Sequence, residues 1–192
     1  CFTAPLKFDA HINAGDVVFD DMFSIYPFEN TLVKLRMSGR QIKGFLEYSY
    51  NMWLSDKPSE HILGICQGAD ERTGARQWHF NRGRSYNFDQ AAGLIYTVNY
   101  RKHFGSRVKI KRLADGRKFR PGGTYSVAMT SYRANGGGGA MPKGAGIRTA
   151  DLENVTLETY SEIRTLIYNY IKDAGKTIGR TDISDESILG NW

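Results

Sequence analysis

The sequence predicts an α+β fold in which mixed sheets are covered by helices packed outside. Segments with the alternating pattern of strands are interleaved with segments of helical periodicity, and few strand-like segments are apolar on both faces. Of the 192 residues, 41% are hydrophobic and 12% aromatic, which is typical of a folded globular protein. Because this length suffices for one domain with a substantial core, residues 1–192 are interpreted as a single domain.

The first elements are predicted between residues 15 and 54. A strand or turn region leads into a short helix at 20–25 and a loop at 26–30. In residues 33–37 apolar side chains alternate with Lys34 and Arg36, which predicts a strand with its apolar face inward. Ser38 and Gln41 form a capping-box pattern. A helix is therefore expected to about Leu54, with helical spacing of Ile42, Phe45, Leu46, Tyr50 and Trp53.

Further strand and helix patterns follow. Residues 55–85 are polar and predict a long excursion with one strand around 61–66. Alternation at 94–98 predicts a strand, and residues 107–113 before Asp115-Gly116 predict a hairpin that leads into another strand at 124–130. An amphipathic helix is expected at 158–174, ending at Gly175, from the spacing of Ile163, Leu166, Ile167, Tyr170 and Ile171.

The charge distribution bounds the classes of partner. The net charge is +6, and basic residues gather at 72–84 and 109–120. Polyanion binding is one interpretation; the solvated face of a hairpin is favoured, because Lys109 and Lys111 alternate with apolar residues. The signatures of DNA- and RNA-binding proteins do not occur, so no nucleic-acid polymer is expected. No apolar stretch is long enough to span a membrane, and no signal segment begins the chain.

Cysteine and histidine usage favours neither a disulfide framework nor a metal site. Two cysteines, Cys1 and Cys66, are too few for such a framework. The four histidines have no metal-binding spacing, and no nucleophile elbow occurs, so neither a metal site nor a catalytic residue is predicted in this chain. Cys1 fits either an internal domain boundary or a mature lipoprotein cysteine, and the boundary is favoured.

Residues 131–139, Ser-Tyr-Arg-Ala-Asn-Gly-Gly-Gly-Gly, contain the main candidate for a binding site. Glycine permits positive φ angles and lets a ligand approach the backbone amides closely. A flexible linker is the alternative, but an alternating strand leads directly into this loop. Residues 139–144 lack the Gly-Lys-Ser/Thr ending of a phosphate loop and no helical pattern follows at once, so P-loop nucleotide hydrolysis is not predicted.

Three loops at strand ends carry aromatic residues: Tyr26 and Phe28 with Asn30, Tyr86 and Phe88 with Asn87 and Asp89, and Tyr132 beside the glycines. If neighbouring strands carry these loops, two rings would stack on a nucleobase, and Asn30 or Asn87 would hydrogen-bond its edge. The alternative is that these rings anchor the loops or belong to the core.

Five segments in order resemble the C-terminal domain of the 5'-nucleotidase family over residues 2–175. They are Gly15-Asp16-Val17, 26–32, 38–42, 86–89 with Gly93-Leu94, and 131–138. The Tyr-Asn-Phe-Asp at 86–89, the Tyr-Arg-Ala at 132–134 and the ending Gly190-Asn191-Trp192 are similar to the branch of 2',3'-cyclic-nucleotide 2'-phosphodiesterase/3'-nucleotidases. The resemblance implies α/β/β/α layers and a domain that holds the nucleoside.

The resemblance also implies that this chain is one half of an exported bacterial phosphohydrolase, periplasmic or at the cell surface. The other half would be an N-terminal metallophosphatase domain with two divalent metals and a catalytic His-Asp pair. The implied partners are therefore a nucleotide or nucleoside and that domain. The alternative is a non-catalytic module that docks a polyanion or a partner protein, and a stand-alone hydrolase is disfavoured because no complete catalytic set is present.

By resemblance, Phe28 and Tyr132 correspond to the family's base-stacking aromatics, and Asn30 to the asparagine that contacts the base. The implied substrate-binding set is completed by Tyr86, Arg133, Asn135, Gly136, Gly137 and Gly138. Two positions depart from the family pattern: Gly138 replaces an aspartate of many members, and Asp9 replaces an arginine of the 5'-nucleotidase branch. Both departures argue against 5'-nucleotide specificity and agree with the cyclic-phosphodiesterase branch.

Overall fold

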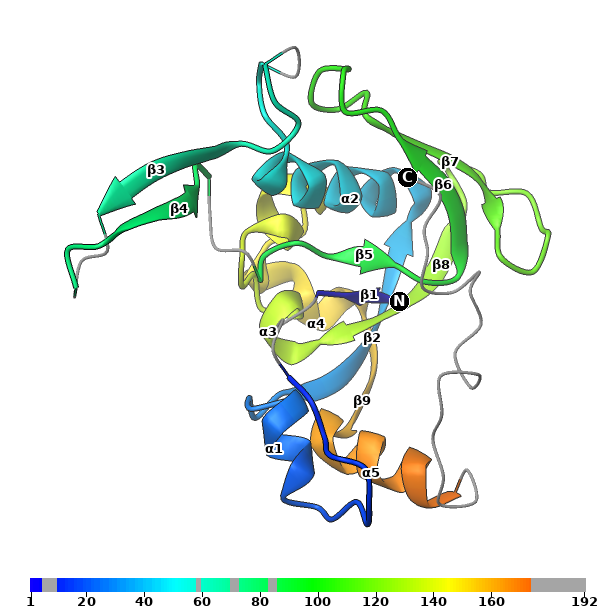
Figure 1. The fold of residues 1–192 in the computed structure, drawn as a ribbon. Helices are drawn as coiled ribbons and strands as arrows, with labels where there is room; N and C mark the ends of the chain where they lie inside the picture. Colours follow the sequence, from blue (N-terminus) through cyan, green and yellow to red (C-terminus); the bar gives the residue numbers. More distant parts are fainter. Residues whose placement is uncertain (5–9, 58–59, 70–72, 83–85, 174–192) are drawn as a thin grey trace.

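The central sheet of the computed structural model is three-stranded and antiparallel. The structure describes residues 1–4, 10–57, 60–69, 73–82 and 86–173. In this sheet β2 (Thr31–Ser38) lies between β8 (Thr124–Thr130) and β9 (Thr156–Glu162). Helix α2 (Gly39–Trp53) begins directly at the end of β2 (Figure 1). The sheet therefore brings together segments that are far apart in the sequence.

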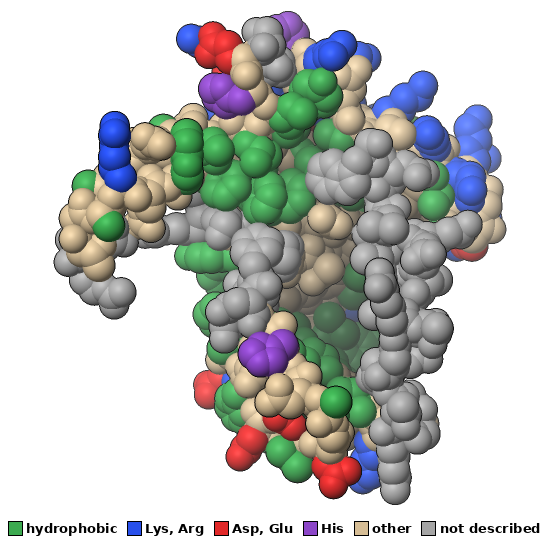
Figure 2. Space-filling view, viewed as in Figure 1, with side chains coloured by type: hydrophobic (Ala, Val, Ile, Leu, Met, Phe, Trp, Pro, Cys, Tyr) green, Lys and Arg blue, Asp and Glu red, His purple; other side chains and the backbone are tan. Residues whose placement is uncertain are grey.

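Among the described residues, three smaller antiparallel pairs accompany this sheet. β1 (Phe2–Thr3) pairs with β5 (Gln90–Ala91), β3 (Ile65–Ala69) with β4 (Arg76–Phe80), and β6 (Leu94–Val98) with β7 (Val108–Leu113). The β3–β4 hairpin projects away from the body, whereas the β6–β7 ribbon curves beside α2 (Figure 1). Lys and Arg side chains gather where that ribbon lies, at the upper right of Figure 2.

Short helices connect β8 to β9. They are α3 (Ser131–Ala134), a π-helix (Ala140–Ala145), a 3-10 helix (Thr149–Asp151) and α4 (Leu152–Val155). Helix α1 (Asp21–Ile25) packs against α5 (Ile163–Asp173). This arrangement of small sheets and helices confirms the predicted α+β class. Among the described helices, none combines the length and apolar content needed to cross a bilayer.

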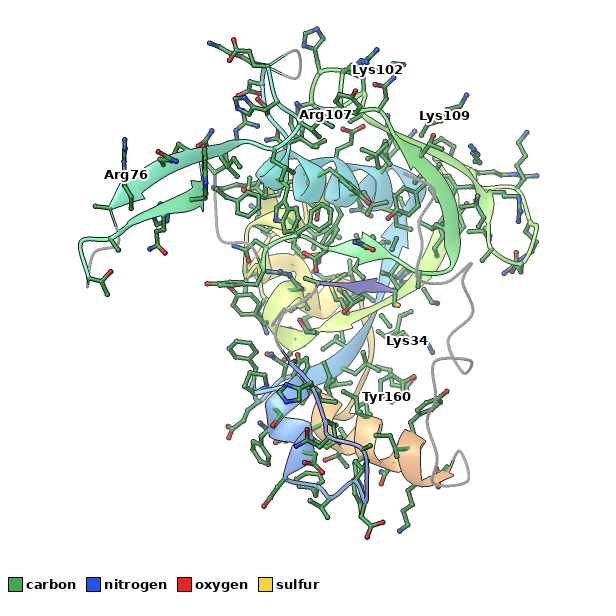
Figure 3. All side chains as sticks on the ribbon, in the orientation of Figure 1. Lys34, Arg76, Lys102, Arg107, Lys109 and Tyr160 are labelled. Carbon is green, nitrogen blue, oxygen red and sulfur yellow. The ribbon has the colours of Figure 1, made fainter. Side chains whose placement is uncertain are left out.

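Local sequence signals are confirmed around β2 and α2. The apolar residues of β2 at 33, 35 and 37 are buried. On the opposite side Lys34 donates to Glu158 Oε2 at 3.3 Å, and Tyr160 also contacts Glu158 (Lys34 and Tyr160 are labelled in Figure 3). The capping box forms, because Gln41 N donates to Ser38 Oγ at 3.3 Å and Ser38 N to Gln41 Oε1 at 2.8 Å. The predicted helix at 20–25 and strands at 94–98 and 124–130 are confirmed as α1, β6 and β8.

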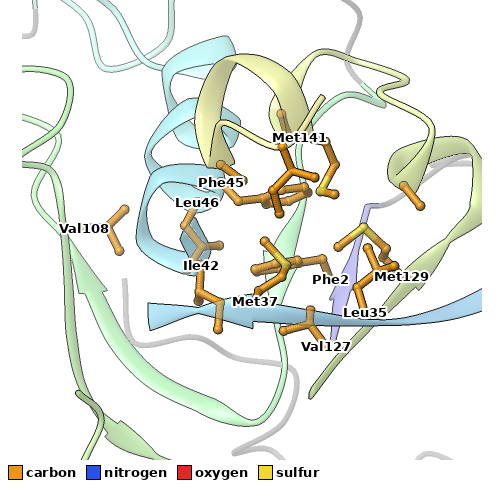
Figure 4. Packing of buried hydrophobic residues seen from close by; sticks show 14 of the residues in the cluster. Phe2, Leu35, Met37, Ile42, Phe45, Leu46, Val108, Val127, Met129 and Met141 are labelled. Atoms are coloured by element: carbon orange, nitrogen blue, oxygen red, sulfur yellow. The ribbon is translucent and has the colours of Figure 1, made fainter. Parts of the chain in front are cut away.

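The core lies between α2, the π-helix and the buried face of the sheet (Figure 4). Leu35, Phe45 and Met129 are almost completely buried there, and Phe2 stacks on Phe45 with ring centroids 4.1 Å apart. A Cβ atom on Gly44 would lie 2.2 Å from the carbonyl oxygen of Gly144. Backbone of α2 and backbone of the π-helix therefore touch directly, which only glycine permits.

The described part of the polar excursion at 55–85 contains two strands, so the prediction of a single strand around 61–66 is wrong in number, and the first strand begins only at Ile65. Residues 61–64 instead run back along the end of α2, where Ser55 N donates to Ile62 O at 2.9 Å and Gly64 N to Trp53 O at 2.8 Å. β3 and β4 form a hairpin immediately afterwards. Most of their side chains are exposed on both faces, so no alternation of apolar residues marked them.

Two further predictions are wrong because the strands pair differently than expected. The turn at Asp115-Gly116 forms, with Gly116 at φ 90°, but β7 pairs with β6 and β8 pairs with β2, so no hairpin leads from 107–113 into 124–130. Residues 156–162 form β9 on the free edge of β2, and α5 begins only at Ile163. The helix predicted from residue 158 therefore starts five residues later, where the helical spacing of apolar residues begins. The predicted stop at Gly175 lies outside the described residues.

Candidate functional site

Two of the predicted loops meet at one end of the central sheet. Leu32 pairs with Thr130, so the loop before β2 and helix α3 after β8 lie at the same end of the sheet. Ser131 Oγ donates to Asn30 Oδ1 at 3.4 Å and accepts from Thr31 N at 3.1 Å. These hydrogen bonds join the loop at 26–30 to the beginning of the segment at 131–139.

Phe28 and Tyr132 both present their rings to solvent at this end of the sheet. Their exposed fractions are 50% and 46%, respectively. The ring of Phe28 meets the buried ring of Tyr26 edge-on, with centroids 6.4 Å apart. Burial raises the pKa of Tyr26, and its hydroxyl accepts a hydrogen bond from Asn30 Nδ2 at 3.1 Å. Tyr26 is therefore an anchor for the loop, while Phe28 remains available to a ligand.

The glycine segment is an ordered turn. Gly136, Gly138 and Gly139 have φ angles of 90°, 75° and 83°, which disfavour any side chain. Gly137 N donates to Tyr132 O at 2.9 Å, and a Cβ atom on Gly137 would lie 2.5 Å from the Tyr132 ring. The ring thus rests on the backbone of the turn. The π-helix follows directly, so the expectation that no helix follows the glycines at once is wrong.

Arg133 is buried and bound to the segment at 86–89. Its Nε donates to Asp89 Oδ1 at 2.9 Å, Nη1 to Asn87 Oδ1 at 2.9 Å and to Gly137 O at 3.2 Å, and Nη2 to Tyr86 O at 2.6 Å. Only 4% of Arg133 is exposed. The side chain therefore holds the third aromatic loop against the glycine turn, and its geometry is that of a positioning residue.

The remaining predicted residues divide between surface and interior. Tyr86 is exposed beside Arg133, whereas Phe88 is buried and stacks on Trp53 with centroids 4.2 Å apart. Asn135 is exposed, and its Nδ2 donates to Ser131 O at 2.9 Å. A Cβ atom on Gly138 would lie 2.4 Å from Arg133 Nη1. The absence of a side chain at position 138 leaves room for the contact between Arg133 and Asn87. Asp9 and the ending at 190–192 lie outside the described residues.

Two opposing effects act on the pKa of Asp89 in its buried pair with Arg133. Burial raises the pKa of the Asp89 carboxyl from its ordinary value of 3.8, while the charge and hydrogen bond of Arg133 lower it. The main chain of Asp89 is fixed as well, because its N–H donates to Ser49 Oγ at 2.6 Å and its C=O accepts from that hydroxyl at 2.7 Å. The segment at 86–89 is therefore anchored both to α2 and to α3.

Arg164 is a residue of this region that the sequence reasoning missed. It lies on α5 and is buried, its guanidinium is 4.2 Å from the Phe23 ring centroid, and Nη1 donates to Pro27 O at 3.3 Å. Its Nε has no hydrogen-bond partner among the described residues. The available signal was a charged residue within the apolar stripe formed by Ile163, Ile167 and Ile171. Arg164 supports the loop that carries Phe28 from below.

The cavity beside the beginning of β8 lies apart from these loops. In the described part of the chain, no three His, Cys, Asp or Glu side chains gather closely enough to hold a metal ion. A cavity of about 450 Å³ is lined by Phe2, Leu94, Thr124 and Tyr125, among others. It borders the beginning of β8, whereas Tyr132 follows the end of that strand, so the cavity is separate from the aromatic loops.

Comparison with known proteins gives consistent matches. The family model described as 5'-nucleotidase, C-terminal domain, matches residues 1–144. The chain is 28% identical over 142 residues to the trifunctional nucleotide phosphoesterase protein YfkN of Bacillus subtilis, covering 67% of this chain and 9% of that protein. It is 25% identical over 197 residues to the 2',3'-cyclic-nucleotide 2'-phosphodiesterase/3'-nucleotidase of Haemophilus influenzae, covering 94% of this chain and 26% of that protein. The chain thus spans about a quarter or less of the length of these relatives.

Solved structures share the fold at low sequence identity. A structure assigned as a 5'-nucleotidase from Staphylococcus aureus aligns with a TM-score of 0.63 at 20% identity, covering 92% of this chain and 30% of the other. The NAD nucleotidase NadN of Haemophilus influenzae aligns with a TM-score of 0.55 at 20% identity, covering 84% and 25%. These alignments place the likeness at the level of the fold.

Proposed function

Because the chain belongs to the family of 5'-nucleotidase C-terminal domains, we propose that it is the domain that recognises the nucleotide or nucleoside in a metal-dependent nucleotide phosphohydrolase. One observation carries this proposal. Phe28 and Tyr132 are about half exposed on two loops that Asn30 and Ser131 join by hydrogen bonds. Two such rings at one end of the sheet suit stacking on a nucleobase. In this proposal residues 1–192 act as one substrate-recognition domain.

The residues of the site have distinct roles in this proposal. Phe28 and Tyr132 stack on the base, and Asn30 hydrogen-bonds its edge, since its amide retains one free N–H and one free lone pair beside the bonds to Tyr26 and Ser131. Tyr86 and the exposed amide of Asn135 border the ligand, and Gly136 to Gly138 form the turn on which the Tyr132 ring rests. Arg133 acts through these groups by holding the loops in place.

The reaction itself is assigned to another part of the protein. Two divalent metals, held by an N-terminal metallophosphatase domain, would stabilise the phosphoryl transition state and activate water. The present chain contributes positioning, which lowers the entropic part of the barrier by holding the substrate in one orientation. We further propose that the whole protein is exported to the periplasm or cell surface and acts on 2',3'-cyclic or 3'-nucleotides. The named activities of the relatives support this choice of substrate.

The isolated chain should bind weakly. Stacking contributes about 1–3 kcal/mol per base, and a millimolar dissociation constant corresponds to about 4 kcal/mol. Two rings and one amide contact therefore predict a dissociation constant on the order of 1 mM. The test has to be run at millimolar ligand for this reason.

Backbone amide NMR shifts of the 192-residue chain titrated with adenosine, 3'-AMP and 5'-AMP test the proposal. We expect shifts centred on residues 26–30 and 131–139. Tyr132→Ala should abolish them, and Phe28→Ala should nearly do so. Matched controls are Tyr170→Ala and Phe104→Ala, whose rings are exposed elsewhere and whose variants should bind as the unchanged chain does. Equal binding by Tyr132→Ala or Phe28→Ala would refute the aromatic clamp.

Salt dependence separates this proposal from the docking alternative. Nucleoside binding at the two rings should depend on base identity and little on ionic strength, because stacking carries no net charge. Docking of a polyanion would instead weaken steeply as salt rises and would be indifferent to the base. If no nucleoside shifts either loop at millimolar concentration, the recognition role of this domain is excluded and the docking alternative is favoured.

A further inference from the structure

The net positive charge of the chain is concentrated in one segment. Residues 101–120 contain nine Lys or Arg residues and one acidic residue, a net charge of +8. Because the whole chain carries +6, the remaining 172 residues together carry −2. This segment comprises most of the loop between β6 and β7, strand β7 and the turn that follows it. The space-filling view shows the corresponding cations along the outer side of the molecule (Figure 2).

The outer face of the β6–β7 ribbon presents unpaired cations. Lys109 and Lys111 are exposed, and in the described part of the chain neither forms a salt bridge. A β-bulge interrupts the pairing, since Ile95 pairs with Arg112 and Tyr96 with Ile110. The extra residue is Lys111, and both Lys111 and Arg112 are exposed as a result, while Leu113 turns inward. Bulges redirect side chains in this way and often occur at functional edges.

The loop at 99–107, which carries the first cations of the segment, is held rigidly from inside. The buried carboxylate of Glu47 accepts hydrogen bonds from Gly105 N at 2.9 Å and Val108 N at 2.7 Å. The buried guanidinium of Arg107 donates to Lys102 O at 2.9 Å. Lys102 and Lys109 extend outward at the upper right of Figure 3, whereas Arg107 lies inside. The loop therefore keeps one shape and presents its tip to solvent.

The tip of this loop exposes an aromatic ring beside cations. Phe104 is 52% exposed and follows Arg101, Lys102 and His103, all of which are exposed. The ring lies on a loop whose shape is fixed by hydrogen bonds to Glu47. An apolar side chain next to exposed cations suits the boundary between headgroups and acyl chains of an anionic bilayer. Single-stranded nucleic acid would require several rings along the cationic face, and the outer positions Ile95, Thr97, Lys109 and Lys111 include none.

We propose that the basic ribbon, defined as residues 95–120 with the Phe104 tip, binds the surface of a membrane that contains anionic phospholipids. Lys109, Lys111 and Arg112 contact the phosphate-bearing headgroups, and Phe104 inserts among them. The attraction is mainly electrostatic and is therefore reversible and weakened by salt. This proposal is independent of the nucleoside site, because Phe28 and Tyr132 lie on other elements.

Co-sedimentation of the 192-residue chain with vesicles tests the proposal. Vesicles of phosphatidylcholine with 30% phosphatidylglycerol should pellet the chain at low salt, and vesicles of phosphatidylcholine alone should not. The double variant Lys109→Glu, Lys111→Glu should lower the partition coefficient about thirtyfold or more, given the contribution of each cation near such a surface. Phe104→Ala should lower it about fivefold and leave the salt dependence unchanged.

A matched control separates a local site from net charge. Lys143→Glu with Lys172→Glu changes the net charge equally at exposed positions outside the ribbon and should bind nearly as the unchanged chain does. An equal loss in this control would overturn the proposal of a specific surface. Absence of binding to anionic vesicles would overturn it too, and binding to a dT20 oligonucleotide but not to vesicles would assign the ribbon to nucleic acid instead. Circular dichroism of each variant verifies that it is folded.

Discussion

The guanidinium of Arg133 binds the carboxylate of Asp89, which lies 44 residues earlier in the sequence, and thereby joins two distant segments. Both charges of this pair are buried, with exposed side-chain fractions of 4% and 2%. A buried pair adds little net stability relative to apolar residues, but removing one partner leaves an unpaired charge in the interior. Arg133 therefore matters most for keeping the loops at 86–89 and 131–139 in register.

Arg133→Ala should destabilise the fold by about 3–5 kcal/mol, because the Asp89 carboxylate would lose its buried counter-charge. Urea unfolding followed by circular dichroism measures this change. Arg148→Ala is the matched control, since Arg148 pairs with Asp151 at 2.7 Å on the surface and its loss should cost less than about 1 kcal/mol. Equal effects of the two substitutions would contradict the structural role of Arg133.

The loss of unfolding free energy caused by Arg133→Ala should depend on pH. Burial raises the pKa of Asp89 and Arg133 opposes that rise, so Arg133→Ala should raise the pKa in the folded state further. Between the ordinary value of 3.8 and the raised value, the folded state binds more protons than the unfolded state, and the free energy of unfolding falls as pH rises. The cost of Arg133→Ala should therefore be smaller near about pH 4.5 than near about pH 7.5. In an Asp89→Asn background this difference should disappear.

Among the elements, α2 and the π-helix pack backbone against backbone at Gly44 and Gly144. Alanine in place of glycine ordinarily stabilises a helix by about 1 kcal/mol. At Gly44 the sign should reverse, because the new methyl group would lie 2.2 Å from the Gly144 carbonyl oxygen. We expect Gly44→Ala to cost about 1–3 kcal/mol in thermal or urea unfolding. Gly122→Ala, with open space around its Cβ position and no positive φ angle, should leave stability nearly unchanged.

The two hairpin ribbons should differ in local stability although they are similar in size. The β3–β4 hairpin contacts the body mainly at its base, where Phe80 stacks on Trp53 with centroids 4.7 Å apart. The β6–β7 ribbon buries Tyr96 and Val108 in the core. Two strands alone are barely stable in water, so amides of residues 65–69 and 76–80 should exchange with deuterium at least about tenfold faster than those of 94–98 and 108–113. Equal protection of both ribbons would contradict this view.

Elements with strong local signals could be predicted from the sequence, and elements defined by remote partners could not. The capping box of Ser38 and Gln41 and the alternation in β2 depend on neighbouring residues only. Strand β9 was missed because most of its side chains are exposed and its glutamates also suit a helix. The partner of β7 was missed because an Asp-Gly turn indicates where the chain reverses, and does not indicate which strand pairs with the next one.

At the scale of the whole molecule, the same distinction applies to the candidate site. Sequence and family resemblance pointed to Phe28, Asn30 and Tyr132, and the structure places all three at one end of the central sheet. Their role in binding stays a prediction. The inward direction of Arg133 depends on Asn87 and Asp89, and the support from Arg164 depends on how α5 packs. Both follow from tertiary contacts that no local pattern encodes.

The position of β2 between β8 and β9 also has a consequence for the order of folding. Lys34 and Glu158, which meet across this sheet, are 124 residues apart in sequence, and Asn30 and Ser131 are 101 residues apart. Contacts of such long range slow folding, because a large loop must close before they form. During synthesis β2 is made early and stays without either partner strand until residue 124 or later has emerged from the ribosome. The junction of the loops at 26–30 and 131–139, which carries Phe28 and Tyr132, is therefore among the last features of this domain to form.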